Sequence, residues 1–226
     1  MITTDAEIKM EREVSESLFL LSVTLERYKQ WIPGMFMQIS LKNKTASEPW
    51  LDGRAFSFAS WGSGKAFILV RKEGAFTTTL IDLSKDTFIT SVRYPFGDFL
   101  LNSMESKVLI AGGAGVSVFL SYLDYLKYAS DVAGDVLLVH SVKRQSEVVK
   151  NIYTNSIPNN VSIKQFITKS DEPEYTGRSS IKVIQNSISD LNNREYFICG
   201  PSKFNSYWQA ELRNFGITPR IEQWEN

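Results

Sequence analysis

A glycine-rich turn is the first feature of the sequence that could carry chemistry. The apolar run Lys107–Ala111 is followed directly by Gly112-Gly113-Ala114-Gly115, and a helical pattern starts at Val116. Glycines between a strand and a helix let backbone N–H groups approach a pyrophosphate without an intervening Cβ. The spacing differs from the usual GxGxxG fingerprint, so a tight strand–helix connection without a ligand remains an alternative.

A second turn of small residues has the same context. Cys199-Gly200-Pro201 ends the apolar run Tyr196–Cys199 and precedes the amphipathic segment Ser202–Phe215. Ligands of open parallel sheets bind beyond the carboxyl ends of the strands. We therefore expect both turns to line one nucleotide-binding crevice.

Composition excludes several other kinds of site. The chain has one cysteine, Cys199, and one histidine, His140, so we expect no intramolecular disulfide, iron–sulfur cluster or other metal site, and a structural role for His140. Lysine plus arginine equals aspartate plus glutamate at 25 each, which argues against a nucleic-acid partner. No apolar run approaches a membrane span, and residues 1–13 lack a signal-peptide pattern, so we expect a cytoplasmic protein.

The elements that must position these turns follow two different rhythms. Short β-branched and aromatic segments separated by glycine and proline predict an antiparallel sandwich or barrel, with strands at Leu18–Leu25, Met35–Leu41, Arg54–Ser60, Ala66–Arg71 and Thr87–Arg93. Strands alternating with helices then predict a parallel α/β sheet. The expected strands are Lys107–Ala111, Asp135–His140, Val161–Ile167 and Tyr196–Cys199, and the expected helices Val116–Tyr128, Ser146–Tyr153, Ile181–Ser189 and Ser202–Phe215. We place the domains at residues 1–103 and 104–226.

Five short motifs occur in a familiar order: Arg54-Ala55-Phe56-Ser57, Gly74-Ala75-Phe76-Thr77, Gly112–Gly115, Cys199-Gly200-Pro201 and Glu222-Gln223-Trp224. In this order they resemble the ferredoxin–NADP reductase superfamily over nearly the whole chain. The resemblance implies an N-terminal antiparallel β-barrel that binds flavin, followed by a C-terminal α/β domain that binds NAD(P)H.

The resemblance also implies a set of flavin contacts. Arg54 would neutralise a flavin phosphate, since a guanidinium pairs its planar fork with phosphate oxygens, and a surface ion pair is the alternative. Ser57 would hydrogen-bond near flavin N5. Gly74 and Thr77 would grip the flavin phosphates through amides and a hydroxyl, although a hairpin or helix-capping turn remains open. The other residues of this implied set are Ala55, Phe56, Val70, Arg71 and Phe76.

Residues implied at the reacting rings lie near the C-terminus. Cys199 resembles the family cysteine beside the nicotinamide, Glu222 its terminal acid, and Trp224 the aromatic residue that covers the flavin. With Ser57, the first two make up the expected catalytic set; core packing is the alternative for Cys199 and Trp224. The implied nucleotide-binding residues are Gly112, Gly113, Ala114, Gly115, Val116, Ser141, Lys143, Arg144, Cys199, Gly200 and Pro201.

Ser141, Lys143 and Arg144 bear on the choice of nucleotide. A hydroxyl and two cations after the second strand of the α/β domain favour NADPH slightly over NADH, because a cation there can bind a 2′-phosphate. A solvated basic turn is the alternative. Two departures from the family pattern, Phe56 for tyrosine and Val118 for proline, leave the electron acceptor open.

The function expected from this resemblance is hydride transfer from NAD(P)H to flavin, with FAD favoured and FMN possible. Three destinations for the electrons remain. The favoured one is a separate protein acceptor such as a ferredoxin or an oxygenase component. The chain also resembles bacterial NAD(P)H:flavin reductases, so free flavin is the second. The third is an electron-transfer subunit that acts only within a larger complex.

Overall fold

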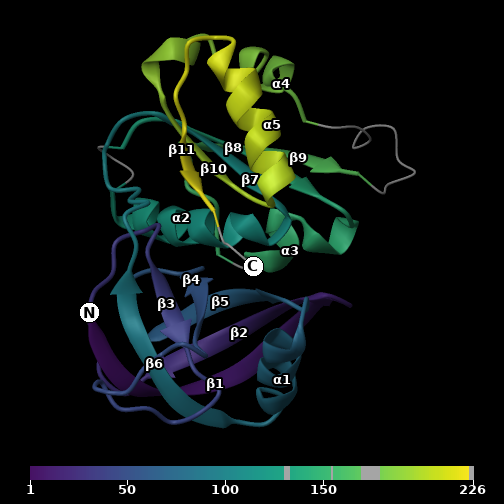
Figure 1. Cartoon of the computed structure of the whole chain (residues 1–226). Coiled ribbons are helices and arrows are strands. Elements are labelled where there is room, and N and C mark those ends of the chain that lie inside the picture. The colour runs from purple at the N-terminus through teal and green to yellow at the C-terminus, as the bar shows by residue number, and fades with distance from the viewer. Residues whose placement is uncertain (130–132, 154, 169–178, 224–226) are drawn as a thin grey trace. The chain divides into compact units, whose positions relative to one another are not determined.

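The computed structural model describes residues 1–129, 133–153, 155–168 and 179–223. The chain divides into two compact units, each with many more contacts within itself than to the other. The first comprises residues 1–102 together with 120–125, and the second comprises residues 103–119 and those from 126 onward. Figure 1 shows the strands of the first unit in purple and blue and those of the second in teal to yellow.

The first unit is built on one antiparallel sheet of six strands in the order β4-β3-β6-β1-β2-β5. Past the end of β4, the N–H of Ala59 donates to the carbonyl of Phe67 in β5 over 2.7 Å, so the two edges of the sheet approach each other and the barrel nearly closes. The strands are β1 Ile2–Ser15, β2 Leu18–Leu25, β3 Phe36–Ile39, β4 Arg54–Ser57, β5 Lys65–Arg71 and β6 Phe88–Phe96.

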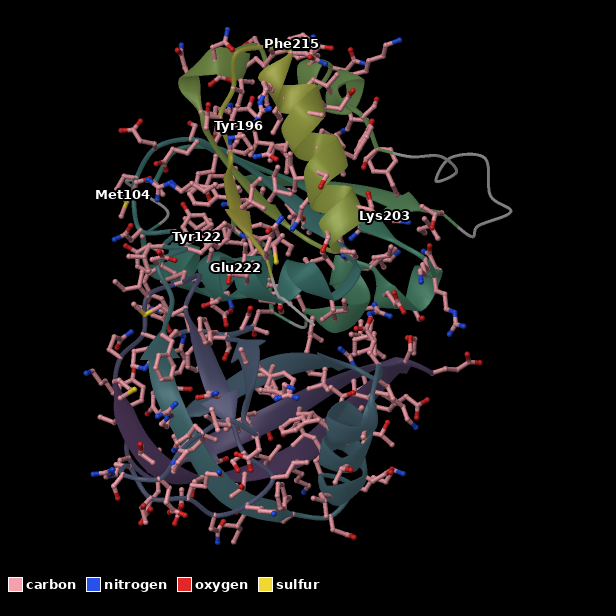
Figure 2. All side chains as sticks on the ribbon, in the orientation of Figure 1. Met104, Tyr122, Tyr196, Lys203, Phe215 and Glu222 are labelled. Atoms are coloured by element: carbon pink, nitrogen blue, oxygen red, sulfur yellow. The ribbon has the colours of Figure 1, made fainter. Side chains whose placement is uncertain are left out.

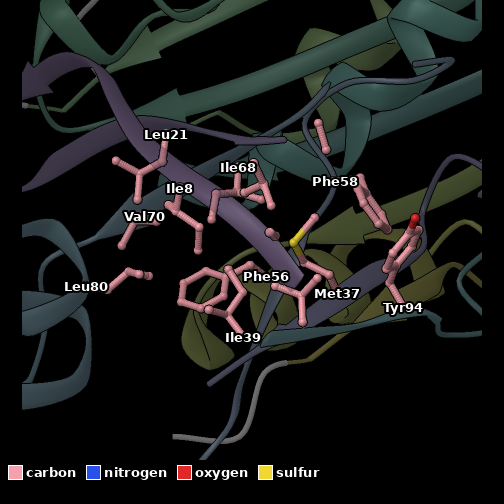
Figure 3. Close-up of a cluster of buried hydrophobic side chains, with 14 of the residues drawn as sticks. Ile8, Leu21, Met37, Ile39, Phe56, Phe58, Ile68, Val70, Leu80 and Tyr94 are labelled. Atoms are coloured by element: carbon pink, nitrogen blue, oxygen red, sulfur yellow. The ribbon is translucent and has the colours of Figure 1, made fainter. Parts of the chain in front are cut away.

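Alternation of apolar and polar residues fills the barrel. In β1, Ala6 and Ile8 are buried while Glu7 and Lys9 between them are exposed, as expected for a strand with one face on the core. Figure 3 shows Phe56 of β4 among aliphatic side chains of this core, including Ile39 and Val70. Burial increases along β4, from the exposed Arg54 at its start to the buried Phe56 and Ser57 at its end.

Helix α1, Ala75–Leu83, joins β5 to β6. It begins after Gly74, where the Thr77 hydroxyl accepts hydrogen bonds from the N–H groups of Glu73 and Gly74 at 3.1 and 3.2 Å. It ends at Ser84, whose hydroxyl donates to the carbonyl of Leu80 over 2.8 Å. A helix-capping turn, one of the two alternatives open for Gly74 and Thr77, is thus present.

The second unit contains a parallel sheet of five strands in the order β11-β10-β7-β8-β9. Apolar side chains of β7, β8 and β10 pack on one face against residues of α4 and α5, among them the fully buried Trp208. The strands are β7 Lys107–Gly112, β8 Val136–Val142, β9 Val161–Ile167, β10 Glu195–Cys199 and β11 Arg220–Glu222. The helices are α2 Ser117–Ala129, α3 Val149–Ile152, α4 Ile181–Gln185 and α5 Ser202–Arg213.

The expected fold class, a barrel followed by a parallel α/β sheet, is confirmed. Strand β9 has the expected bounds, whereas β1, α1 and β11 were not anticipated. Two expected helices are shorter than predicted. In the segment Ser146–Tyr153, the extended Val148 (φ −69°, ψ 153°) separates α3 from the end of a short 3₁₀ helix, Gln145–Glu147. The segment Ile181–Ser189 contains only α4, which ends at Gln185.

Candidate functional site

The implied flavin residues of the first unit come together where β4 meets the start of α1. The Arg54 guanidinium carbon lies 5.7 Å from the centre of the Phe76 ring, and the Phe56 and Phe76 rings are 6.2 Å apart. Among the described residues, no carboxylate lies within 4.0 Å of Arg54, so the alternative of a surface ion pair is not observed there. An exposed guanidinium beside two aromatic rings is suited to a phosphate that is joined to a planar ligand.

Gly74 provides a test of whether an anion fits here. Its φ of −166° is ordinary extended backbone, and a Cβ added to it would have no protein atom within 4 Å. Nothing in the protein itself therefore requires glycine at this position. The first amides of α1 point out of the helix without intrahelical acceptors, and a bare backbone beside them leaves room for a phosphate oxygen.

The remaining implied flavin residues differ in what they can offer. Ser57 is 7% exposed, and its hydroxyl makes no hydrogen bond to another described residue, so it remains available to a ligand. Val70 points into the barrel core, which leaves only its backbone, and Arg71 donates to the Ser17 hydroxyl over 3.0 Å. The Thr77 hydroxyl is already engaged in the capping turn described above. Ala55 is half-buried in β4 opposite Gln38.

In the second unit, the glycine-rich turn forms a short 3₁₀ helix, Gly113–Val116, in which the Val116 side chain is buried and Ala114 partly so. Gly113 has a φ of +56°, which favours glycine. Its carbonyl oxygen lies 3.0 Å from Nε2 of His140, which faces it from β8. The structural role expected for His140 is thus that it holds this turn.

The two glycine turns touch each other. A Cβ on Gly115 would lie only 2.7 Å from the carbonyl carbon of Cys199 and closer still to its oxygen. A Cβ on Gly200 would lie 2.7 Å from the Phe204 ring and 3.1 Å from the Cα of Gly112. Backbone meets backbone at the carboxyl ends of β7 and β10, so the two turns lie directly against each other.

The ladder places further implied residues at the same edge. Ser141 lies opposite Gly112 in β8, and its hydroxyl is 2.7 Å from that of Ser179. Lys143 and Arg144 follow and are exposed, in agreement with either a 2′-phosphate site or a solvated turn. Glu222 lies opposite Cys199 in the β10–β11 ladder, while Trp224 lies outside the described residues. Pro201 packs close to Gly112 and precedes α5.

Sequence reasoning missed three residues that shape this edge: Phe204, Asn205 and Ser179. The Phe204 ring packs over Gly112 and Gly200, and Asn205 donates from Nδ2 to the carbonyl of Glu222 over 3.0 Å. Both follow the Cys199-Gly200-Pro201 turn within one helical turn, which was the only signal for them. Ser179 gave none, because it lies 38 residues from Ser141.

A buried cation occupies the opposite, amino edge of the sheet. Lys107 is fully buried, and its Nζ donates to the carbonyls of Ser103 and Glu105 at 2.9 and 2.8 Å and lies 3.2 Å from Glu195. Burial lowers the pKa of Lys107. Burial raises the pKa of Glu195, but hydrogen bonds from Ser103 and Lys107 outweigh this and leave that pKa lowered. This cluster is remote from the strand ends that hold the glycine turns.

Within the described part of the chain, no group of three or more histidine, cysteine, aspartate or glutamate residues is arranged to hold a metal ion. None of the described helices is long and apolar enough to cross a membrane.

Comparison with known proteins supports the assignment of the second unit. Residues 109–209 match the sequence family described as "Oxidoreductase NAD-binding domain". The chain is 27% identical over 236 residues to a flavohemoprotein of Bacillus anthracis, and the match covers 92% of this chain and 56% of that protein. It is also 27% identical over 203 residues to the electron transfer component of 2-halobenzoate 1,2-dioxygenase from Burkholderia cepacia, covering 85% of this chain and 58% of that protein.

A solved structure shares the fold of the whole chain. The crystal structure of a ferredoxin NADP⁺ reductase from Neisseria gonorrhoeae with bound FAD and NADP superposes with a TM-score of 0.74 at 15% identity, covering 95% of this chain and 92% of that one. The chain thus spans little more than half the length of the flavohemoprotein that it matches, but nearly all of this reductase. The predicted resemblance is confirmed at the level of the fold: the chain shares the two-domain fold of this ferredoxin NADP⁺ reductase, and residues 109–209 match the oxidoreductase NAD-binding domain family.

Proposed function

We propose that this chain is an NAD(P)H-dependent flavoprotein reductase that holds FAD on its barrel and NAD(P)H on its α/β unit. The contact between the two glycine turns, with Gly115 against the carbonyl of Cys199, carries the proposal. It brings two stretches of accessible backbone to the carboxyl ends of neighbouring parallel strands, where nucleotides bind in such sheets. The family match over residues 109–209 supports the same placement.

On the barrel, Arg54 and the first amides of α1 would bind the flavin phosphates, and the open space over Gly74 would admit them. Phe56 and Phe76 would offer apolar faces to the rest of the cofactor, and Ser57 would donate a hydrogen bond at its reacting edge. FAD rather than FMN is supported by the FAD bound in the Neisseria reductase.

On the α/β unit, amides of Gly113–Val116 would bind the pyrophosphate of NAD(P)H. Cys199 would leave room for the nicotinamide, and Glu222, beside it in the ladder, would accept a hydrogen bond at the reacting rings. Lys143 and Arg144 would bind a 2′-phosphate, which favours NADPH. When bound, flavin supplies the chemistry, since it accepts a hydride and can release the electrons one at a time.

The favoured acceptor is a separate protein such as a ferredoxin or an oxygenase component. This choice is supported by the similarity to the electron transfer component of a dioxygenase. The chain is also similar to a flavohemoprotein, of which it spans 56%. Reduction of a haem protein as the electron acceptor should therefore be measured as well. Cys199, the chain's one cysteine, is buried and has no second cysteine in the chain to pair with, which suits the reducing cytoplasm that we propose as its location.

The test is a visible absorption spectrum of the purified, desalted protein, followed by anaerobic addition of NADPH or NADH. Flavin bands that bleach on addition would support the proposal, and the faster nucleotide would decide between the two. A colourless protein that oxidises NAD(P)H only with added flavin would support a free-flavin reductase. A colourless protein that does not oxidise NAD(P)H even with added flavin would leave only the third hypothesis, an electron-transfer subunit that acts within a larger complex.

Gly74→Ala provides a matched test of the flavin site. The new methyl group would meet no protein atom, so the urea midpoint should not change, whereas the affinity for FAD should fall by about tenfold if phosphate lies there. Gly64→Ala is the control, because Gly64 also has open space and lies away from α1. Equal FAD affinity in the two variants would contradict the placement of the phosphates.

A further inference from the structure

Strand β11 is too short to be placed by its ladder alone. It contains three residues, Arg220–Glu222, and pairs with β10 at the edge of the sheet. Its first residue is anchored by side chains: the Arg220 guanidinium is 3.7 Å from Glu195 and lies over the Phe197 ring at 5.5 Å. The position of the other end, which carries Glu222, therefore depends on further contacts.

Asn205 of α5 is one residue that holds this end. It is fully buried in the first turn of α5, where its N–H donates to the carbonyl of Pro201 over 3.0 Å. Its Nδ2 donates to the carbonyl of Glu222 over 3.0 Å. Since Glu222 lies opposite Cys199 in the ladder, one side chain connects the helix that follows the glycine turn to the main chain beside the cysteine.

The hydrogen bond from Nδ2 to the carbonyl of Glu222 explains why position 205 carries an asparagine rather than an apolar residue. Only the amide nitrogen can donate to a carbonyl, so the orientation of the side chain is fixed. Oδ1 is then left as a buried acceptor with no partner among the described residues, which costs free energy that an apolar side chain would avoid. A leucine of similar size would fill the same space, so packing alone does not account for asparagine.

We propose that Asn205 is a positioning residue: it fixes the backbone at Glu222 and thereby the placement of that carboxylate beside Cys199 when nicotinamide reacts. Figure 2 shows Glu222 at the end of β11 and Lys203 in the first turn of α5, the turn that also carries Asn205. The inference rests on the proposed function, and adds to it a residue that touches neither cofactor. Asn205 acts through Glu222 alone.

Two variants test this role. Asn205→Leu removes both the hydrogen bond and the unpartnered acceptor, so the urea midpoint should stay the same or rise while the limiting rate of flavin bleaching by NAD(P)H falls about tenfold. Asn205→Asp cannot donate when ionised, but a protonated carboxyl can. Its rate relative to wild type should therefore fall about tenfold at pH 8 and recover toward wild type at about pH 5.

The measurement is anaerobic stopped-flow bleaching over a range of nucleotide concentrations, which separates the limiting rate from the apparent Kd. The apparent Kd should change less than about threefold, because the glycine turns are untouched. Asn214→Asp, exposed at the far end of α5, is the charge control and should match wild type at both pH values. If the wild-type protein bleaches and both Asn205 variants bleach at the same limiting rate, the inference alone is overturned. If the wild-type protein does not bleach, the proposed function is overturned and the inference with it.

Discussion

The substitution Gly115→Ala tests the contact between the two glycine turns most directly. A Cβ at this position would lie 2.7 Å from the carbonyl carbon and 3.0 Å from the Gly200 nitrogen, with the carbonyl oxygen of Cys199 nearer than either. Ordinary carbon contacts are ~3.5–4.0 Å. Every atom in the way belongs to the backbone at the end of a buried strand, so no side chain can rotate aside. The turn itself must move.

The expected cost follows from this geometry. Overpacking a buried site costs about 1–3 kcal/mol, and a clash with backbone should lie at the upper end of that range. With a urea dependence of about 2 kcal/mol per molar, the midpoint of unfolding should fall by roughly 1 M. The same displacement moves the amides of the turn away from Cys199, so binding of NAD(P)H should weaken more than tenfold in a fluorescence titration.

Gly64→Ala is again the control, because an alanine there meets nothing within 4 Å. It should leave the midpoint unchanged or raise the stability by about 0.4–1 kcal/mol, through a smaller entropy of the unfolded chain. Equal urea midpoints for the two variants would refute the reasoning, since they would show that the turns do not press against each other.

Three further outcomes are expected. Lys107→Met should lower the free energy of unfolding by about 3 kcal/mol in urea, because Glu195 and two carbonyls lose a buried donor. Burial raises the pKa of Tyr196 to about 12, so the neutral phenol stabilises the fold below about pH 10, and roughly 2–3 kcal/mol should be lost as pH rises from 10 to 12. Tyr196→Phe should lack that loss when midpoints are compared across this range. Thr77→Val should cost about 1 kcal/mol in the same urea assay, because two amides lose their acceptor at the start of α1.

The sequence predicted those parts of the fold in which pattern and burial agree. Strand β9 was predicted with its observed bounds, and the parallel sheet followed from apolar runs alternating with helices. Strand β1 was missed although its alternation of buried and exposed residues is regular, because its exposed face is rich in charge and reads as a polar segment. Helix α1 was missed because its three consecutive threonines disfavour a helix locally. Its caps and the burial of Leu80 and Ile81 stabilise it instead.

The candidate site could be predicted only where a motif follows a strand. The glycine turns were found because a strand end and a helix start flank each of them in the sequence. Asn205, Phe204 and the hydrogen bond of His140 to Gly113 depend on which strands become neighbours and in what register. Strand β11 pairs with β10, and no local pattern in Arg220–Glu222 predicts this pairing. Residues of this kind require the tertiary structure.

The glycines of the site fall into two physical classes, and the distinction decides what each can reveal. Gly112, Gly115 and Gly200 are packed against backbone or an aromatic ring, so the fold alone requires them even without a nucleotide. Substituting any of them therefore disturbs the fold and the nucleotide site together. Gly74 has ordinary backbone angles and open space on its Cβ side, so the protein gains nothing from glycine there. An alanine at Gly74 should leave the fold unchanged, so this is the position on the barrel where a phosphate bound by the first amides of α1 can be tested without disturbing the fold.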